Sequence, residues 1–346
     1  MNNFHTLTDE QKRLVLRNAE ENVHLPAAAI EKDMWVTTIL QILFDLDLDA
    51  NILFKGGTSL SKIGNLIERF SEDIDIAIDP AKYGLSGDLT KKQLKNLRKR
   101  SSLYVKDVLA PALQQGLEKY GLAQTLALEV EPDGEGDSTY PEPRRIFVKY
   151  PLLLADRYSY LKNEVVLEVG ARSLMEPTIA CHITSMIESC SPTINTSLVN
   201  PEIVTAAPAK TFVEKACLLH ELFSIERDTI VAKRRSRHLY DLERMMDLDF
   251  AKKAMEDNDL WQSVQHHRSI FTSMQNIDYS ADFRKSIVLC PPDKFIAGWE
   301  EDYRQMCETM IYGEKLPFTT LIAHIKELEH RFHSLSIPAI ADKSSV

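Results

Sequence analysis

Two aspartates that lie two residues apart are the residues in this chain whose spacing points most directly to chemistry. Asp73 and Asp75 stand in the segment Ser71–Asp79, where isoleucines occupy the alternate positions. Side chains of a strand alternate between its two faces, so both carboxylates project from one face. Two carboxylates held that close repel each other unless a cation lies between them, and hard oxygen ligands favour Mg²⁺. The spacing therefore predicts a divalent metal site at Asp73 and Asp75.

A pair of glycines ahead of this strand indicates where a phosphate would bind. The apolar run at residues 52–54 predicts a buried strand, and the apolar spacing over residues 60–67 predicts a helix. A strand, a glycine turn and a helix start leave backbone N–H groups that favour a phosphate. The residues predicted to bind phosphates are Gly56, Gly57, Thr58 and Ser59. The segment lacks the G-x-x-x-x-G-K-[ST] order, which argues against a P-loop kinase or NTPase.

The glycines and aspartates together resemble the nucleotidyltransferase fold related to DNA polymerase β. The segment KGGTSLSK, followed by an R-x-S-x-D-x-D strand, is similar more narrowly to the AbiEii/AbiGii toxin nucleotidyltransferases, the group that includes the MenT toxins. The resemblance implies that Arg69 and Ser71 contribute to nucleotide binding and that Lys62 neutralises phosphate charge. Either motif alone is commonly a surface strand or a simple turn, so the prediction depends on their joint spacing.

A polymerase-like site requires a third carboxylate on a neighbouring strand. The segment at residues 164–169 alternates as a strand does, and Glu168 lies in the otherwise apolar sequence VVLEVGAR. A carboxylate in such surroundings is costly unless it is paired or liganded. We therefore predict Glu168 as the third metal ligand, with Glu129, on a strand predicted at residues 126–130, as the alternative.

Two charged motifs occur further along the chain. Lys215 lies on an apolar-rich helix, where a lysine that extends its amine to solvent is the ordinary interpretation. Arg237 or His238 can share a helical face with Asp241, which an ion pair within the helix would explain. The E-K pair and the R-H-x-Y-D-L segment of the toxin family both occur here. The resemblance implies that Lys215 contacts phosphate, that Asp241 is an active-site carboxylate, and that Arg237 and His238 help to bind the nucleotide.

The predicted fold class is α+β, with a polymerase-β-like nucleotidyltransferase domain followed by a mainly helical domain. The first domain, residues 1–195, would contain N-terminal helices and a small mixed sheet with flanking helices. Residues 189–208 are rich in Pro, Ser, Thr and Asn and predict a linker. Residues 196–346 would form the helical domain and contribute active-site residues. The charged triplet at residues 31–33 also resembles a feature of the toxin family, although an exposed charged turn explains it equally well.

Composition restricts the class of protein. The 346 residues carry a net charge of -10, which argues against a generic nucleic-acid coat protein, yet basic clusters occur at residues 91–100, 144–149 and 233–238. Part of the first cluster is a candidate contact to nucleic-acid backbone. Five cysteines without C-x-x-C spacing indicate neither a disulfide framework nor a zinc site. We expect a cytoplasmic protein without a membrane span.

The leading functional prediction is Mg²⁺-dependent nucleotide transfer from an NTP. The resemblance implies a toxin of a toxin–antitoxin or phage-defence system, RNA as acceptor, tRNA 3′ ends in particular, a block of growth, and a cognate antitoxin as partner. Nucleotidylation of a protein hydroxyl, similar to AMPylation, is an open alternative. A non-catalytic nucleotide- or RNA-binding module is a further one, disfavoured because such a module has no need to hold two unneutralised carboxylates together.

Overall fold

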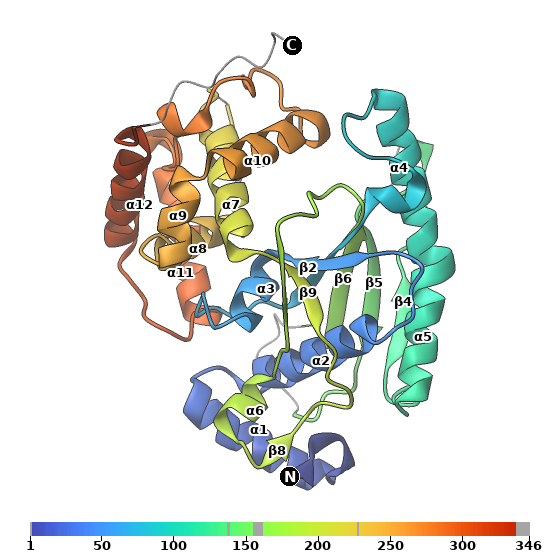
Figure 1. Ribbon diagram of the computed structural model, residues 1–346. Coiled ribbons are helices and arrows are strands. Elements are labelled where there is room, and N and C mark those ends of the chain that lie inside the picture. Colours follow the sequence, from blue (N-terminus) through green and yellow to red (C-terminus); the bar gives the residue numbers. More distant parts are fainter. Residues whose placement is uncertain (1, 137–138, 155–161, 227, 337–346) are drawn as a thin grey trace. The chain divides into compact units, whose positions relative to one another are not determined.

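The structure is a computed structural model that describes residues 2–136, 139–154, 162–226 and 228–336. The chain forms two compact units, shown in Figure 1. Unit 1 comprises Met1–Ala207 and Met310–Glu314, and unit 2 comprises Pro208–Thr309 and Lys315–Val346. Residues 196–207, assigned to the second domain in the sequence analysis, thus belong to unit 1.

The described part of unit 1 is built around a mixed seven-stranded sheet (Figure 1). In spatial order the strands are β4 (Ala127–Val130), β5 (Arg144–Lys149), β6 (Glu164–Gly170), β3 (Asp73–Ile78), β2 (Ile52–Lys55), β9 (Ile203–Ala206) and β7 (Thr178–Cys181). The β3–β6 and β2–β9 pairs are parallel, and the other pairs are antiparallel. The predicted α+β fold class is therefore confirmed.

Helices cover one face of this sheet and leave its charged face to form a site. Ile74 and Ile76 of β3 are buried on the covered face, whereas Asp73 and Asp75 are only partly buried. Helix α2 (Ala27–Phe44) packs against β3 and β6 and is buried along nearly its whole length. The alternation expected of a strand thus separates apolar from acidic side chains as the sequence predicted.

Unit 1 contains five further helices in its described residues, and three of them begin at a side-chain cap. The five helices are α1 (Asp9–Val23), α3 (Gly56–Lys62), α4 (Lys91–Tyr104), α5 (Ala110–Lys119) and α6 (Met186–Cys190), with a π-helical turn at Val105–Leu109 between α4 and α5 and short 3₁₀ turns at Phe4–Thr6 and Pro80–Tyr83. Thr8 caps α1 in a capping box with Gln11, and Thr90 caps α4 in the same way with Gln93.

The predicted linker at residues 189–208 was wrong, because this segment contains two strands. The short β8 (Ile194–Asn195) pairs with β1 (Asn2–Asn3), and β9 pairs with β2 on one side and β7 on the other. Backbone pairing on both edges of β9 outweighs a composition that on its own favours a loop.

A short segment far along the chain returns to unit 1. The Phe70 N–H donates to Met310 O at 2.8 Å, and the Tyr312 N–H donates to Glu68 O at 3.1 Å. Residues 310–314 therefore add backbone hydrogen bonds to the stretch that leads into β3.

The described part of unit 2 is mainly helical, as predicted. Its helices are α7 (Pro208–Phe223), α8 (Ser236–Met245), α9 (Asp249–Glu256), α10 (Asn258–Phe271), α11 (Ile296–Thr309) and α12 (Phe318–His333), with 3₁₀ turns at Phe283–Lys285 and Asp293–Phe295. Its core is aromatic: Phe332 stacks on Phe212 with ring centroids 6.4 Å apart and meets Trp261 edge-on at 5.4 Å. Within the part of the chain that is described, no helix has the length and apolarity to span a membrane.

Candidate active site

The two glycines allow two charged side chains to lie against the start of α3. Gly56 has a φ of +83°, and a Cβ added there would overlap Asp75 Oδ2. A Cβ on Gly57 would lie 2.6 Å from Arg69 Nη2. Only glycine accommodates both this backbone conformation and these contacts. The structure therefore places the Asp75 carboxylate and the buried Arg69 guanidinium directly at the glycine turn.

The hydroxyls of the glycine motif join α3 to its neighbours. Thr58 Oγ1 donates to the backbone oxygen of Asp73 at 2.5 Å and lies 2.8 Å from Ser71 Oγ. Ser59 is fully buried, and its hydroxyl donates to Gly56 O at 2.8 Å. Predicted as phosphate contacts, Thr58 and Ser59 instead make hydrogen bonds that hold the turn, so phosphate binding there would depend on backbone N–H groups.

Three of the predicted carboxylates come together on the charged face of the sheet. In the parallel β3–β6 pair, Asp75 is opposite Glu168 and Asp73 is opposite Val166. Residues directly opposite in a sheet share a face and lie close together. Asp73, Asp75 and Glu168 are therefore neighbours on two adjacent strands, as the sequence predicted.

The closeness of the three carboxylates affects the pKa of Glu168. Burial raises it above the ordinary value, and the negative charges of Asp75 and Asp73 raise it further. Arg145 and Lys55 act in the opposite direction. A carboxyl surrounded by like charge binds a proton more tightly, and a cation in the same place would relieve the same repulsion.

Two basic residues that sequence reasoning did not assign to the site complete a row across four strands. Lys55 of β2 is opposite Asp75, and Arg145 of β5 is opposite Glu168. The row is thus a lysine, two carboxylates and an arginine, which we call the charged row. The alternation of side chains along the neighbouring strands could have identified both residues. Lys55 directly precedes the glycines, and Arg145 lies on the exposed face of its strand.

The donor set fits a magnesium ion that is shared with a substrate. Among the described residues no group of three or more His, Cys, Asp or Glu side chains is arranged to hold a metal ion by itself. Magnesium usually binds through one or two carboxylates and completes its shell with water and substrate phosphates. Asp73, Asp75 and Glu168 offer only oxygen ligands and carry the mutual repulsion described above.

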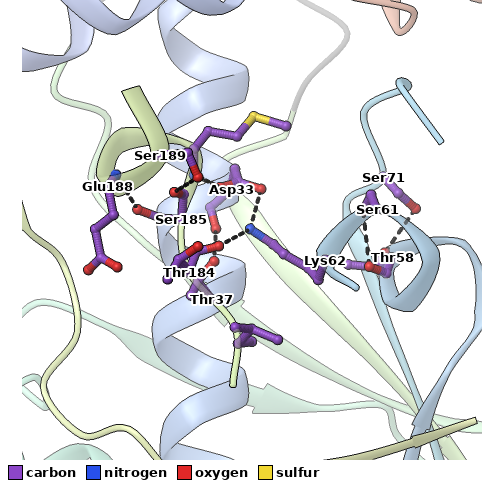
Figure 2. A network of polar contacts seen from close by, with 12 residues as sticks. Asp33, Thr37, Thr58, Ser61, Lys62, Ser71, Thr184, Ser185, Glu188 and Ser189 are labelled. Atoms are coloured by element: carbon purple, nitrogen blue, oxygen red, sulfur yellow. Dashed lines mark hydrogen bonds and ion pairs between the residues drawn. The ribbon is translucent and has the colours of Figure 1, made fainter. Parts of the chain in front are cut away.

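Lys62 forms its contacts inside unit 1. Its amine forms an ion pair with Asp33 of α2 at 2.6 Å and donates to Thr184 O at 3.2 Å (Figure 2). The two side chains of the pair are only 5% and 4% exposed. Its charge is thus paired with Asp33 inside the unit, and the role of Lys62 toward phosphates stays a prediction.

The triplet at residues 31–33 is buried in the first half of α2, so the interpretation as an exposed turn was wrong. Lys32 donates to Glu72 Oε2 at 2.6 Å, next to Asp73, and to Lys162 O at 3.2 Å, shortly before β6. Asp33 accepts from the Met186 N–H at 2.8 Å in addition to pairing with Lys62. The triplet thus ties α2 to the starts of the two strands that carry the site.

The alternative third carboxylate lies elsewhere in the sheet. Glu129 is on β4, at the edge of the sheet, and pairs with Lys149 of β5 at 2.6 Å. Its register partner is Phe147, and two strands separate it from β3. Glu168 is therefore the carboxylate that joins the two aspartates.

The predicted residues of unit 2 lie on two helices, α7 and α8. Lys215 of α7 and Asp241 of α8 make an ion pair of 2.9 Å, and both are buried. Arg237 and His238 lie on the first turn of α8, four and three residues before Asp241, respectively. The roles of these four residues toward a nucleotide stay predictions.

Comparison with known proteins identifies the family of this chain. Among solved structures, the chain is similar to MenT4, a nucleotidyltransferase toxin from Mycobacterium tuberculosis H37Rv, with 15% sequence identity and a TM-score of 0.45 over 96% of this chain and 100% of that one. No curated protein matches the sequence. The model of the nucleotidyl transferase AbiEii toxin family, type IV toxin–antitoxin system, matches residues 38–330. Since that match spans most of the chain, this protein belongs to the AbiEii family of nucleotidyltransferase toxins.

Proposed function

We propose that this enzyme transfers a nucleotide from an NTP to an RNA hydroxyl, at the 3′ end of tRNA, and that it requires Mg²⁺. The observation that carries the proposal is the pair of strands that brings Asp73, Asp75 and Glu168 together beside the glycine turn. The family supplies the reaction class. The choice of tRNA comes from the resemblance to the toxin nucleotidyltransferases.

In this reaction the acceptor hydroxyl oxygen forms a bond to the α-phosphorus of the NTP while the bond from that phosphorus to the bridging oxygen of the β-phosphate breaks, and pyrophosphate leaves. Asp73, Asp75 and Glu168 would hold the metal, and a carboxylate of the charged row can accept the hydroxyl proton. When bound, magnesium supplies neutralisation of the triphosphate and lowers the pKa of the attacking hydroxyl. Backbone N–H groups at Gly56 and Gly57 would face the phosphates.

Other residues of the proposal neutralise the negative charge of the triphosphate or hold the glycine turn. Lys55 and Arg145, at the two ends of the charged row, would neutralise phosphate oxygens beside the carboxylates. Arg145 also forms an ion pair with Glu131, so its guanidinium would be shared between Glu131 and a phosphate. Arg69 lies against Gly57 and Ser71 contacts the Thr58 hydroxyl, so both hold the glycine turn in place. The family motifs further propose Lys215, Asp241, Arg237 and His238 as nucleotide-binding or catalytic residues supplied by unit 2.

The biological setting follows from the family. A toxin that modifies tRNA in the cytoplasm would block growth, and a cognate antitoxin would restrain it. An adjacent reading frame that encodes a small regulatory protein is the expected context.

The test is a transfer assay with each of the four α-labelled NTPs, Mg²⁺, and either purified tRNA or a protein extract. Label on tRNA that disappears with EDTA is the expected result. Label confined to protein would overturn the tRNA assignment in favour of protein nucleotidylation. Absence of label in both mixtures, with NTP still bound, would favour a binding module.

A further inference from the structure

The first half of α4 presents a row of lysines beside an aromatic ring. Lys92, Lys95 and Lys99 are exposed and recur at spacings of three and four, so they share one helical face. Together with the side chains of Gln93, Asn96 and Tyr140 they line a hollow of about 400 Å³. The Lys99 amine lies 5.4 Å from the centre of the Tyr140 ring. We call this hollow the α4 groove.

The arginines of the same helix have a different role. Arg98 Nε donates to Tyr140 O at 2.6 Å and so holds the backbone of that residue at the helix. Arg100 donates to Tyr83 O at 2.8 Å, and its guanidinium lies 5.0 Å from the centre of the Tyr83 ring. In this run Arg98 and Arg100 therefore bind the protein backbone, whereas Lys92, Lys95 and Lys99 line the groove.

The charge of the groove contrasts with that of the whole chain. The protein has a net charge of -10, so three cations on one helical face form a local positive region that attracts anions. From Lys92 to Lys99 the helix rises about 10 Å, which spans more than one phosphate of a nucleic-acid strand. An amide and an aromatic ring beside such a row suit bases and backbone of a single strand.

The groove is joined to the strand that carries Glu168. Two residues after Tyr140, the carboxylate of Glu142 accepts from the Ala171 N–H at 2.6 Å. Ala171 directly follows β6, on which Glu168 lies. Within unit 1, the loop that forms one wall of the groove is therefore fixed to the end of a site strand.

We propose that the α4 groove holds the acceptor RNA, with Lys92, Lys95 and Lys99 on its phosphates and Tyr140 as a stacking surface for one base. This inference rests on the proposed function, because it assigns the surface to the acceptor of that reaction.

The experiment measures binding of fluorescent tRNA to the full chain between 0.05 and 0.2 M salt. The variant Lys92→Gln/Lys95→Gln/Lys99→Gln should bind on the order of 100-fold more weakly near 0.15 M, and the slope of log K against log salt should fall by about 2 to 3. Lys252→Gln/Lys253→Gln/Lys285→Gln makes the same change in net charge at exposed positions of unit 2 and should bind as wild type does. Tyr140→Leu should weaken binding about tenfold, while Tyr140→Phe, which keeps the ring, should not.

The outcomes separate the two proposals. If the triple variant binds and labels tRNA as wild type does, the groove assignment fails and the proposed function stands. If wild type labels only protein but binds tRNA through the groove, the proposed function fails, and the groove binds RNA that is not the acceptor of the reaction. Polyglutamate serves as a probe of an acidic protein partner. If the triple variant loses as much affinity for polyglutamate as for tRNA, and Tyr140→Leu leaves tRNA binding unchanged, the RNA assignment is overturned in favour of such a partner. Matching circular dichroism and thermal unfolding of all variants establish that each is folded.

Discussion

Unit 1 contains two clusters of charged side chains, and they differ in how the charges are paired. Around α2, Asp33 meets Lys62 and Lys32 meets Glu72, each at 2.6 Å and largely shielded from water. In the charged row, by contrast, the two carboxylates Asp75 and Glu168 are neighbours, and the pKa of Glu168 is raised as a result. Each of these four charges around α2 has an opposite partner, whereas the neighbouring carboxylates of the charged row are the groups for which we propose a cation.

The largest expected effect comes from the charged row. Asp75→Asn keeps the shape of the side chain beside Gly56 but removes a metal ligand, so nucleotide transfer should fall about a thousandfold. Thermal stability without metal should stay unchanged or rise, because a repulsive charge is lost. Initial rates of label transfer and thermal unfolding of the same preparation check both statements. A fall in melting temperature parallel to the fall in rate would show that Asp75 is a structural residue.

The second-largest effect is expected for the buried ion pairs around α2, and it distinguishes a role in stability from a role in catalysis. Asp33→Ala leaves the Lys62 ammonium buried without its partner, which should lower the free energy of unfolding by about 3–5 kcal/mol. Transfer per folded molecule should change little. Denaturant unfolding and active-site-normalised rates measure the two quantities.

A matched double variant sharpens this test. Asp33→Ala/Lys62→Met removes both charges and should recover much of the lost stability. If Lys62→Met alone abolishes transfer while stability is retained, Lys62 binds the nucleotide after all and the contrast between the two clusters fails.

The smallest expected effect is on the pH dependence of stability. The folded-state pKa of Glu168 is raised above its unfolded value, so its contribution to stability is fully present below the unfolded pKa and is lost as the pH rises through the folded pKa. In metal-free protein, Glu168→Gln should therefore be more stable than wild type at neutral pH and equal to it in acid. Thermal unfolding in EDTA from pH 4 to pH 8 tests this, and equal stability across that range would contradict the crowding of the carboxylates.

The site residues that sequence reasoning found are those with local patterns. Strand parity was enough to put Asp73 and Asp75 on one face, and the apolar surroundings of Glu168 were enough to mark it as unusual. The partner of Lys62 could not be predicted, because Asp33 lies on another helix 29 positions earlier and no local spacing connects the two.

The same limit explains the errors in the fold. β9 was missed because its strand identity depends on pairing with β2 and β7, which are distant in sequence. An exposed turn was offered as an explanation of the triplet at residues 31–33 because charged residues are seldom buried. The energetic cost of burying Lys32 and Asp33 is offset by their contacts to Glu72 and to the Met186 N–H, which are distant in sequence.

The hydrogen bonds between residues 310–314 and the stretch before β3 make the first unit discontinuous in sequence. A gene fragment that stops at residue 207 would omit the piece that covers Glu68 and Phe70, so dissection of the enzyme by a single truncation would damage the half it was meant to isolate. During synthesis on the ribosome, the nucleotide-binding half would also reach its final form only after nearly the whole chain has emerged, which delays the appearance of toxic activity until the protein is almost complete.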